Sequence, residues 1–590
     1  MAFVVAALVA AGHAWSIPSG LFLDDHAHYR QLREGDWSYR SAVAAARLGI
    51  VGDVMDLWSR QETGLRFYRP IAFWIMRAEY TAGRWNPAVM HGFSLAWHWL
   101  GAMLVGMLAW HLIGRWTWAG VAACLMAVHP GHVVTVYWIA CQTELMATAF
   151  ILLATLSYAR YAGWWRARGQ RVLSAPQADG AAAGELSPPD GSQAASAGAA
   201  AGRNGAWLAL ALAFYALAMG CREHAIMWPA IIVTGDAAFG AERRRRLRAY
   251  ALAGLLAVVY LLARQQALHG FPLPGRPYLM RPGDPGFARY IVDKLIYYMI
   301  GVFAYVPVLP IAGTDYFRSH PGTFYGTFAG VAVTLLLILS GAHARRPLLF
   351  LLAWTAVFFV PLLPVFASMH HLYLPSVGAV CLLAAGLAVL AGPSGGPRRV
   401  VAWVLAGVNV AVLAGFAWGF GRTYTGATRV EDVVVRDVIE NGRSLRDGDH
   451  LFFINLPMLA YYAIPAIENA TGRHDLHGHV LTVSPWLLRM EKPAALRRLD
   501  DRTIELTAPP GAEYFGGVAG RTLLAVMGFT DAFRTGDCLS ASLFDVEILE
   551  ADTDGIRRLR FRFRESVDSP RFHFFFGSPV RWAYPVFGKP

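Results

Sequence analysis

The sequence predicts a polytopic α-helical membrane protein with a soluble C-terminal domain of mixed α and β structure, and three observations lead to this fold class. Hydrophobic residues make up 56% of the 590 residues, charged residues only 16%, and the mean hydropathy is +0.38. A soluble chain of this length carries more charge on its surface. Apolar runs of about 20 residues, the length that crosses a bilayer core, recur before residue 421 and are missing after it.

The apolar runs predict about eleven membrane-spanning helices within a domain of residues 1–420. They are residues 1–17, 91–112, 116–127, 139–158, 207–220, 225–239, 250–262, 324–339, 348–366, 372–390 and 400–420. The first run is short and has no basic segment before it, so a retained anchor and a cleaved signal peptide are both open, with the anchor favoured. In either case residues 20–69 form a first extracytoplasmic loop.

Clusters of arginine orient these helices. Arg243 to Arg246, Arg345-Arg346 and Arg398-Arg399 each stand at the end of an apolar run, as cytoplasmic flanks do. The excess of 52 Lys and Arg over 40 Asp and Glu therefore indicates orientation in a membrane, and nucleic-acid binding is not predicted.

The number of spans between the arginine clusters decides whether one ambiguous segment crosses the membrane. Residues 290–310 are apolar but contain Asp293, Lys294 and two prolines. All three arginine clusters are cytoplasmic only if this segment does not span, so we expect an interfacial or re-entrant segment. It lies in an extracytoplasmic loop of residues 264–323, and the C-terminus is then outside the cytoplasm as well.

Two further regions have distinct compositions. Residues 164–205 are rich in Ala, Gly, Ser and Pro and lack large apolar side chains, which predicts a disordered cytoplasmic linker. Residues 421–590 alternate in polarity, which predicts an extracytoplasmic α+β domain with strands at 450–455, 502–507 and 558–563 and an amphipathic helix around 430–441.

The acidic pair Asp24-Asp25 follows the first apolar run, in the segment GLFLDDHAHYR that also holds His28. Two adjacent carboxylates beside lipid raise the pKa of at least one of them unless a metal ion, an arginine or a substrate cation compensates. A carboxylate at this boundary is suited to removing a proton from a hydroxyl acceptor. It is equally suited to capping a solvated helix, and chemistry alone leaves both interpretations open.

Four more polar clusters fall on the same predicted side of the membrane. They are Arg66 to Arg69 with Trp74, Arg77 and Glu79; His129 and His132 with Trp138 and Glu144; Cys221-Arg222-Glu223-His224; and His370-His371 with Tyr373. Each has an ordinary explanation: interfacial anchoring, loop histidines satisfied by backbone, or a local Arg222–Glu223 pair. Their convergence on one face predicts a shared site.

Five cysteines show no CxxC spacing, and neither a disulfide framework nor a zinc site is predicted.

In their order along the chain these motifs resemble those of the GT-C glycosyltransferases, and within them the TMTC-type protein O-mannosyltransferases and related bacterial membrane proteins. The elements that carry the resemblance are Asp24-Asp25, Tyr68-Arg69-Pro70, His91, His129-Pro-Gly-His132 with Trp138-Ile139, Arg222-Glu223 and His371-Leu-Tyr-Leu-Pro-Ser376. The resemblance covers about residues 20–390.

What the resemblance implies is transfer of a sugar, mannose or another hexose, from a polyprenyl-phosphate donor to an extracytoplasmic acceptor by direct displacement. Asp24 or Asp25 would be the general base, and Arg69, Arg222 and His371 would contact the donor phosphate. The full implied substrate-binding set is His28, Arg69, His129, His132, Arg222, Glu223, His371 and Tyr373. The implied location is the bacterial inner (plasma) membrane, with the site on the periplasmic side.

Some points depart from this family or stay open. Arginine is usual where His370-His371 stand, and the C-terminal domain shows no tetratricopeptide period, so a cadherin-like acceptor is not implied. Some GT-C enzymes use a divalent metal ion, for which Asp24, Asp25 and His28 are candidate ligands. The acceptor is a protein Ser/Thr, a glycan or a lipid.

Two other classes of function compete with a transferase. A transporter or flippase would also place charges within the membrane, but it predicts inverted repeats with paired broken helices, which the sequence does not show. A sensor or scaffold would use the C-terminal domain to bind a partner and would not need Asp24 or Asp25.

Overall fold

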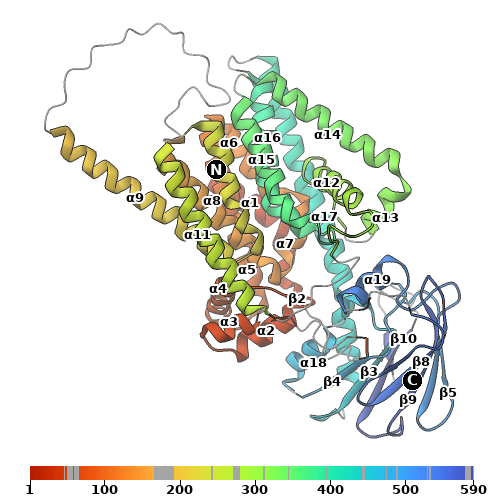
Figure 1. Cartoon of the computed structure of the whole chain (residues 1–590). Helices are drawn as coiled ribbons and strands as arrows, with labels where there is room; N and C mark the ends of the chain where they lie inside the picture. Colours follow the sequence, from red (N-terminus) through yellow and green to blue (C-terminus); the bar gives the residue numbers. More distant parts are fainter. Residues whose placement is uncertain are drawn as a thin grey trace.

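The chain folds as a bundle of long helices with a sheet domain at one end (Figure 1). The structure, a computed structural model, describes residues 1–45, 47–48, 57–58, 65–164, 192–240, 243–269, 279–309, 312–342, 345–392, 396–441, 445–460, 462–473, 475–486, 490–527, 529, 533–578 and 586–588. The predicted fold class, a polytopic helical membrane protein with a C-terminal α+β domain, is confirmed.

Eight helices in these residues are long and apolar enough to cross a membrane. They are Ala2–Ser19 (α1 and the 3-10 helix η1), α5 (Pro87–Ile113), Ile139–Ala162 (η3 and α8), Arg246–Ala267 in α11 (Arg243–Ala267), α14 (Pro321–Gly341), Arg345–Leu362 (α15 and η7), Met369–Ala391 (η8 and α16) and Pro397–Glu440 in α17 (Pro397–Asn441). A ninth is formed if α6 (Trp116–Val128) and the segment Pro130–Tyr137 (η2 and α7), bent by 48°, count as one span.

Among the described residues, eight or nine helices reach spanning length by this criterion, against about eleven expected. Every predicted segment lies on a helix, but those on α6, α9 (Ser192–Met219) and α10 (Trp228–Phe239) are short. The apolar part of α9 is Gly205–Met219, and α10 has 12 residues. A helix of that length rises about 18 Å, well short of a bilayer core of about 30 Å.

Helical structure also begins earlier than expected beside the predicted linker. The greater part of that linker, residues 165–191, lies outside the described residues, whereas α9 already begins at Ser192. The stretch 192–204 is rich in alanine, the residue with the highest helix propensity, and this favours helix over the expected disorder.

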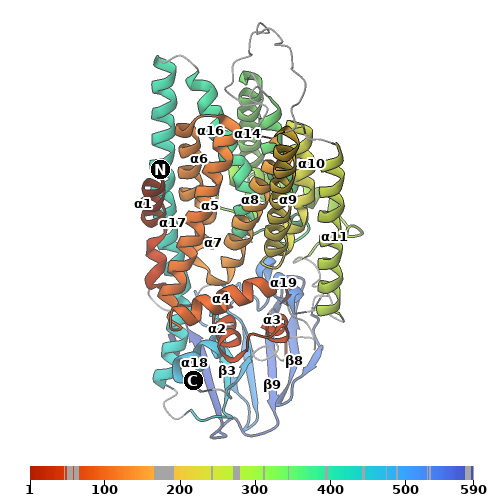
Figure 2. The ribbon, with the colours of Figure 1, turned by 90° about the vertical axis from the view of Figure 1, so that its left-hand side faces the viewer.

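A layer of short elements covers the end of the bundle that faces the C-terminal domain (Figure 2). It contains α2 (Asp25–Glu34), α3 (Tyr39–Ala45), α4 (Pro70–Ala82) and the two-residue strands β1 (Arg47–Leu48) and β2 (Leu65–Arg66). The segment expected to be interfacial forms α12 (Phe287–Phe303), which is not among the helices of spanning length, and is followed by α13 (Ala312–Ser319). Residues 270–278 and 310–311 of that predicted loop lie outside the described residues.

The C-terminal domain is built from two sheets. The first has the order β11-β10-β3-β4, with β10, β3 and β4 parallel, and the second is antiparallel in the order β5-β6-β9-β8-β7. The strands are β3 (His450–Ile454), β4 (His477–Val480), β5 (Ala495–Arg498), β6 (Thr503–Thr507), β7 (Cys538–Ser540), β8 (Phe544–Ala551), β9 (Ile556–Phe563), β10 (Phe572–Ser578) and β11 (Val586–Gly588). The three predicted strands are confirmed as β3, β6 and β9.

Apolar faces of the two sheets form the core of this domain, in which Phe452, Phe544 and Phe561 are fully buried. Helices η9 (Met458–Ala460), α18 (Ala463–Thr471) and α19 (Gly517–Val526) accompany the sheets. The predicted helix around 430–441 is also confirmed, but as the end of α17, which passes without a break through the expected boundary at residue 421. A single helix thus joins the two domains.

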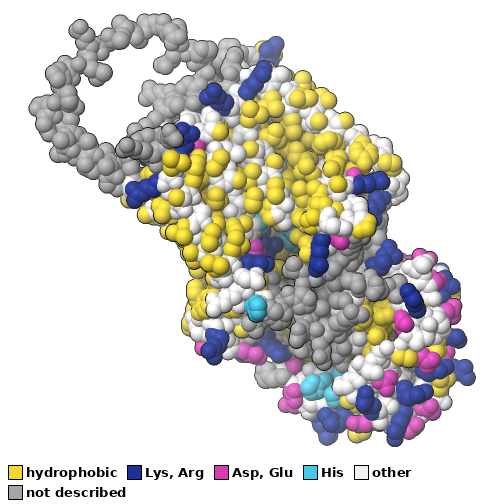
Figure 3. Space-filling model, viewed as in Figure 1, with side chains coloured by type: hydrophobic (Ala, Val, Ile, Leu, Met, Phe, Trp, Pro, Cys, Tyr) yellow, Lys and Arg dark blue, Asp and Glu magenta, His cyan; other side chains and the backbone are white. Residues whose placement is uncertain are grey.

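The first loop is anchored in the C-terminal domain as well. The ring of Trp58 is fully buried against Phe515, with ring centres 4.5 Å apart. Its indole N–H lies 3.0 Å from the Val480 carbonyl oxygen. Figure 3 shows apolar side chains covering the helix bundle, with charged and histidine side chains at the lower border of this surface and over the C-terminal domain.

Candidate active site

The turn before α2 holds Asp24 and Asp25 in a defined geometry. Leu23 adopts a left-handed conformation (φ +50°), which a leucine takes only when its surroundings hold it there. The Glu431 carboxylate, from α17, accepts a 2.9 Å hydrogen bond from the Leu23 N–H and supplies part of this support. The loop that carries the acidic pair is therefore fixed by a residue more than 400 positions away.

Both carboxylate oxygens of Asp25 are hydrogen-bonded inside the protein. Its side chain is 1% exposed. Oδ1 accepts the Ala140 N–H at 2.7 Å, and Oδ2 accepts the N–H groups of Phe22 at 3.1 Å and Ile139 at 3.4 Å. Burial, and then the charge of Asp24, raise the pKa of Asp25 well above its usual value. These contacts give Asp25 the role of fastening the loop to the 3-10 helix η3 (Ile139–Cys141), just before α8.

Asp24 faces a different environment. Its side chain is partly exposed, and Oδ1 accepts a 2.7 Å hydrogen bond from the indole N–H of Trp138. Burial raises the pKa of Asp24 to about 7, while the Trp138 hydrogen bond and the charges of Arg69 and Arg222 act to lower it. A carboxylate with a pKa near neutrality is matched to general base catalysis.

Arg69, the residue just before α4, is paired with Glu223. Nε and Nη2 donate to the Glu223 carboxylate at 2.9 to 3.1 Å, and the guanidinium lies 3.9 Å from the ring centre of Phe67. Burial acts to raise the pKa of Glu223, but the charge and hydrogen bonds of Arg69 together with the charge of Arg222 lower it to about 2. The pair uses Nε and Nη2, and Nη1 of Arg69 has no hydrogen-bond partner among the described residues.

Arg222 forms a second and more deeply buried ion pair, not with Glu223 but with Glu144. The Arg222 Nε lies 3.1 Å from Glu144 Oε2, and His224 Nε2 lies 3.1 Å from Oε1 of the same carboxylate. Arg222 also donates to Thr143 Oγ1 at 3.1 Å. The expected local Arg222–Glu223 pair is thus replaced by two crossed pairs that join the 3-10 helix Glu223–Met227 (η6) to α8 and to the loop before α4.

Of the two histidines before α16, His370 contacts Trp138. The His370 ring meets the Trp138 ring edge to face, with centres 6.0 Å apart, and Nδ1 bonds to Ser368 Oγ at 2.8 Å. His371 is 5% exposed, and its Nδ1 bonds to the Tyr298 hydroxyl of α12 at 2.7 Å. His370 is therefore nearer to the acidic loop by contact than His371, which the sequence had favoured.

His129, His132 and Tyr373, all expected to bind substrate, lie in a buried network of hydrogen bonds. His129 and His132 are fully buried and lie within bonding distance of the carbonyl oxygens of Val302 (3.2 Å) and Met126 (2.9 Å). The Tyr373 hydroxyl lies 2.7 Å from His98 Nδ1 in the same core. Because these groups already have hydrogen-bond partners within the protein, the geometry favours a role in holding helices together.

His28, the remaining expected site residue, lies on α2 one turn after Asp24. It is partly exposed, and burial together with the Arg69 charge lowers its pKa to about 4, so the imidazole is neutral at pH 7.

The residues here do not fit a shared metal ion. Both oxygens of Asp25 already accept backbone N–H groups. Across the described part of the chain, no group of three or more His, Cys, Asp or Glu side chains is arranged to hold a cation.

Lys294 is a further candidate residue of this site, although the sequence had suggested it only as an indicator of membrane topology. It is 5% exposed on α12, donates to the Leu362 carbonyl oxygen at 2.7 Å and lies 5.1 Å from the ring centre of Tyr298. Burial lowers its pKa well below the usual value, and among the described residues no carboxylate pairs with it. A lysine inside an apolar segment was itself the signal that could have identified it.

The chain matches no protein-family model, and no curated protein sequence matches it. Its fold is similar to that of the Archaeoglobus fulgidus oligosaccharyltransferase AglB in complex with an inhibitory peptide and a dolichol-phosphate (13% identity, 83% of this chain and 65% of that chain, TM-score 0.42). It is also similar to ArnT from Cupriavidus metallidurans bound to undecaprenyl phosphate (15% identity, 79% of this chain and 83% of that chain, TM-score 0.40). The chain thus spans 65% of the length of the archaeal enzyme. The likeness is partial, and it assigns no role to any residue of this chain.

Proposed function

We propose that this protein is a glycosyltransferase that moves a sugar from a polyprenyl-phosphate donor to an acceptor hydroxyl at the extracytoplasmic surface of the plasma membrane. The observation that carries the proposal is the setting of Asp24. It is a partly exposed carboxylate with a pKa near 7, placed at the end of an apolar helix bundle and within the electrostatic field of Arg69 and Arg222.

The arrangement supplies a base and cations at one level of the molecule. A lipid-linked donor keeps its isoprenoid chain in the bilayer, so its phosphate must be met at the ends of the spans. Arg69 has its Nη1 group without a hydrogen-bond partner among the described residues, and Lys294 donates one hydrogen bond, to the Leu362 carbonyl oxygen. Burial lowers the pKa of Lys294, and a phosphate anion beside it would favour the charged form. Cations that face a leaving phosphate stabilise the charge that develops on it.

The reaction is a single displacement. Asp24 takes the proton of the acceptor hydroxyl as its oxygen attacks the anomeric carbon, a new C–O bond forms, and the bond from that carbon to the phosphate oxygen breaks. The electron pair leaves with the polyprenyl phosphate, and the anomeric configuration is inverted. Of the two aspartates, Asp24 is assigned this step because Asp25 is occupied by three backbone N–H groups. Mannose or another hexose is the sugar we favour.

The test is a transfer assay with purified full-length protein, radiolabelled polyprenyl-phosphate hexoses and cell-envelope extract. We expect Asp24→Asn to lower transfer by at least about a hundredfold, the range in which a general base contributes. Glu34→Gln, an exposed carboxylate on the same helix, is the matched control and should keep wild-type activity. Equal transfer by the wild type and Asp24→Asn would refute the assignment.

A further inference from the structure

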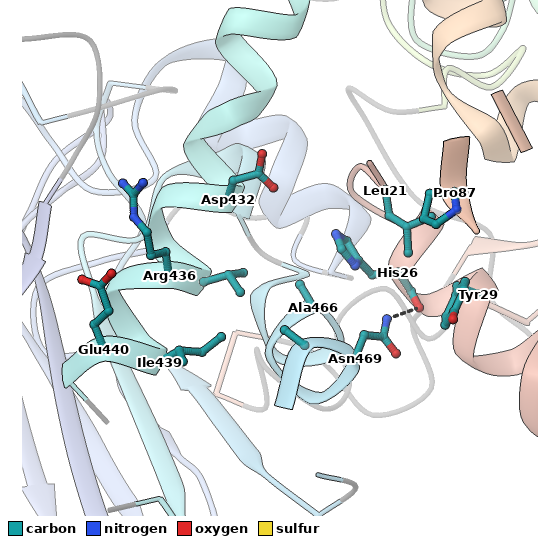
Figure 4. Close-up of a pocket in the computed structure, with 12 residues that line it drawn as sticks. Leu21, His26, Tyr29, Pro87, Asp432, Arg436, Ile439, Glu440, Ala466 and Asn469 are labelled. Atoms are coloured by element: carbon teal, nitrogen blue, oxygen red, sulfur yellow. Dashed lines mark hydrogen bonds between the residues drawn. The ribbon is translucent and has the colours of Figure 1, made fainter. Parts of the chain in front are cut away.

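A pocket of about 520 Å³ lies between the catalytic loop and the C-terminal domain (Figure 4). Most of its lining comes from one face of each of three helices, and Leu21 and Pro87, the first residue of α5, complete it. Residues His26 and Tyr29 come from α2, the row from Asp432 to Glu440 comes from the end of α17, and Ala466, Asn469 and Ala470 come from α18. The spacings of three and four residues within each helix put these side chains on the same side. The volume lies within the range of small-molecule sites.

The pocket is tied to the loop that holds the base. Asn469 donates to the His26 carbonyl oxygen at 3.3 Å, as Figure 4 shows, and Arg30 of α2 forms an ion pair with Glu468 of α18. Glu431, next to Asp432, holds the Leu23 N–H. A ligand in this pocket therefore touches α2 at His26, two residues after Asp24.

His26 is the feature that indicates a ligand. Its side chain is only 13% exposed, and in the described structure neither ring nitrogen makes a hydrogen bond, the nearest acid being Glu431 at 3.6 Å. Burial lowers the pKa of His26 to about 4, so at neutral pH the ring carries one donor and one acceptor. Both ring nitrogens are shielded from solvent in this structure, and leaving them without partners is costly. A hydroxyl group, which both donates and accepts, would satisfy them once the His26 ring turned toward the pocket.

The charges of the lining also select among ligands. Asp432, Glu440 and Arg436 are exposed at the rim, so the carboxylates outnumber the guanidinium and a phosphorylated ligand is disfavoured. Apart from His26 and Asn469, the rest of the lining is apolar or aromatic, including Tyr29. Aromatic and apolar surface with a few hydrogen-bonding groups suits an uncharged, hydroxyl-rich molecule.

We infer that this pocket binds an uncharged saccharide, the non-reacting part of the acceptor glycan, and so holds the acceptor beside Asp24. This inference rests on the proposed function and narrows its acceptor to a glycan. The C-terminal domain then contributes directly to acceptor selection through α18.

Binding tests this inference independently of transfer. Saturation-transfer NMR on the purified full chain in nanodiscs, with mannobiose, cellobiose and diacetylchitobiose as probes, should detect binding of at least one. Ala470→Trp, at an exposed position of the lining, fills the pocket, and His26→Phe removes the hydrogen-bonding ring while keeping its size. Each should weaken binding by at least about tenfold, the effect of losing one or two hydrogen bonds or the space itself.

Thr471→Trp is the matched control, because it adds the same ring at an exposed position of α18 outside the lining. It should bind as the wild type does, and so should Asp24→Asn, which separates this inference from the proposed function. Loss of transfer with retained saccharide binding would contradict the transferase but not the pocket. Failure of all three disaccharides to bind, equal binding by Ala470→Trp, or preference for mannose 6-phosphate or a Ser/Thr octapeptide would each overturn the inference.

Discussion

The indole nitrogen of Trp138 donates a 2.7 Å hydrogen bond to Oδ1 of Asp24. This contact joins the residue after α7 to the turn before α2, and the indole ring also meets the His370 ring. Trp138 thus sets both the position of the proposed base and part of its pKa. Three segments that are far apart in the sequence meet at this one side chain.

The pH dependence of transfer should report Asp24. The base must be ionised to accept a proton, and its pKa is about 7, so kcat/KM should rise with pH through neutrality and level off above it. The Trp138 hydrogen bond lowers this pKa. Trp138→Phe should therefore move the midpoint to higher pH, measured between pH 5 and 9. Trp116→Phe, at an exposed position on α6, should leave the midpoint unchanged, and an unmoved midpoint in Trp138→Phe would argue against Asp24 as the titrating base.

Asp25 should matter for stability. Asp25→Ala leaves three backbone N–H groups without their acceptor, at about 1–3 kcal/mol for each group that water does not reach. We expect a clear fall in the melting temperature of the purified protein, while Glu34→Ala on the same helix changes it little. A wild-type melting temperature for Asp25→Ala would show that the loop does not depend on these bonds.

The buried pair of Arg222 and Glu144 should behave as a unit. Removing one partner leaves an uncompensated charge in an apolar environment, which costs about 3–5 kcal/mol. Glu144→Gln and Arg222→Gln should each lower the melting temperature strongly, and the double variant should lose less than the sum of the two. Additive losses would contradict the coupling.

Substitution of Lys294 should raise the KM for the sugar donor and leave the KM for the acceptor unchanged. If its ammonium group meets the donor phosphate, Lys294→Gln should raise the KM for the polyprenyl-phosphate sugar by about tenfold or more, since a hydrogen bond to a charged group contributes about 1.5–3 kcal/mol. Lys492→Gln, in the C-terminal domain, is the matched control. An unchanged donor KM would remove Lys294 from the proposed phosphate site.

Composition and hydropathy alone were sufficient for the membrane architecture, the C-terminal α+β domain and three of its strands. These properties are local, because the apolar length of a helix and the alternation of a strand are written in consecutive residues. The same local criterion counted α9 and α10 as spans, since run boundaries are blurred where a short apolar helix adjoins polar turns. The acidic pair and the arginines were also recognisable, as charges beside apolar runs are rare.

Only the tertiary structure decided which polar groups pair with one another. Arg69 pairs with Glu223 across 154 positions and Leu23 with Glu431 across 408, and no spacing in the sequence encodes such contacts. It also separated Asp24 from Asp25, because only folding brings the backbone N–H groups of Ile139 and Ala140 to one aspartate and the Trp138 indole to the other. The roles of two adjacent and chemically identical side chains follow from what surrounds them: hydrogen bonding and desolvation depend on distance in space, which the order of residues does not fix.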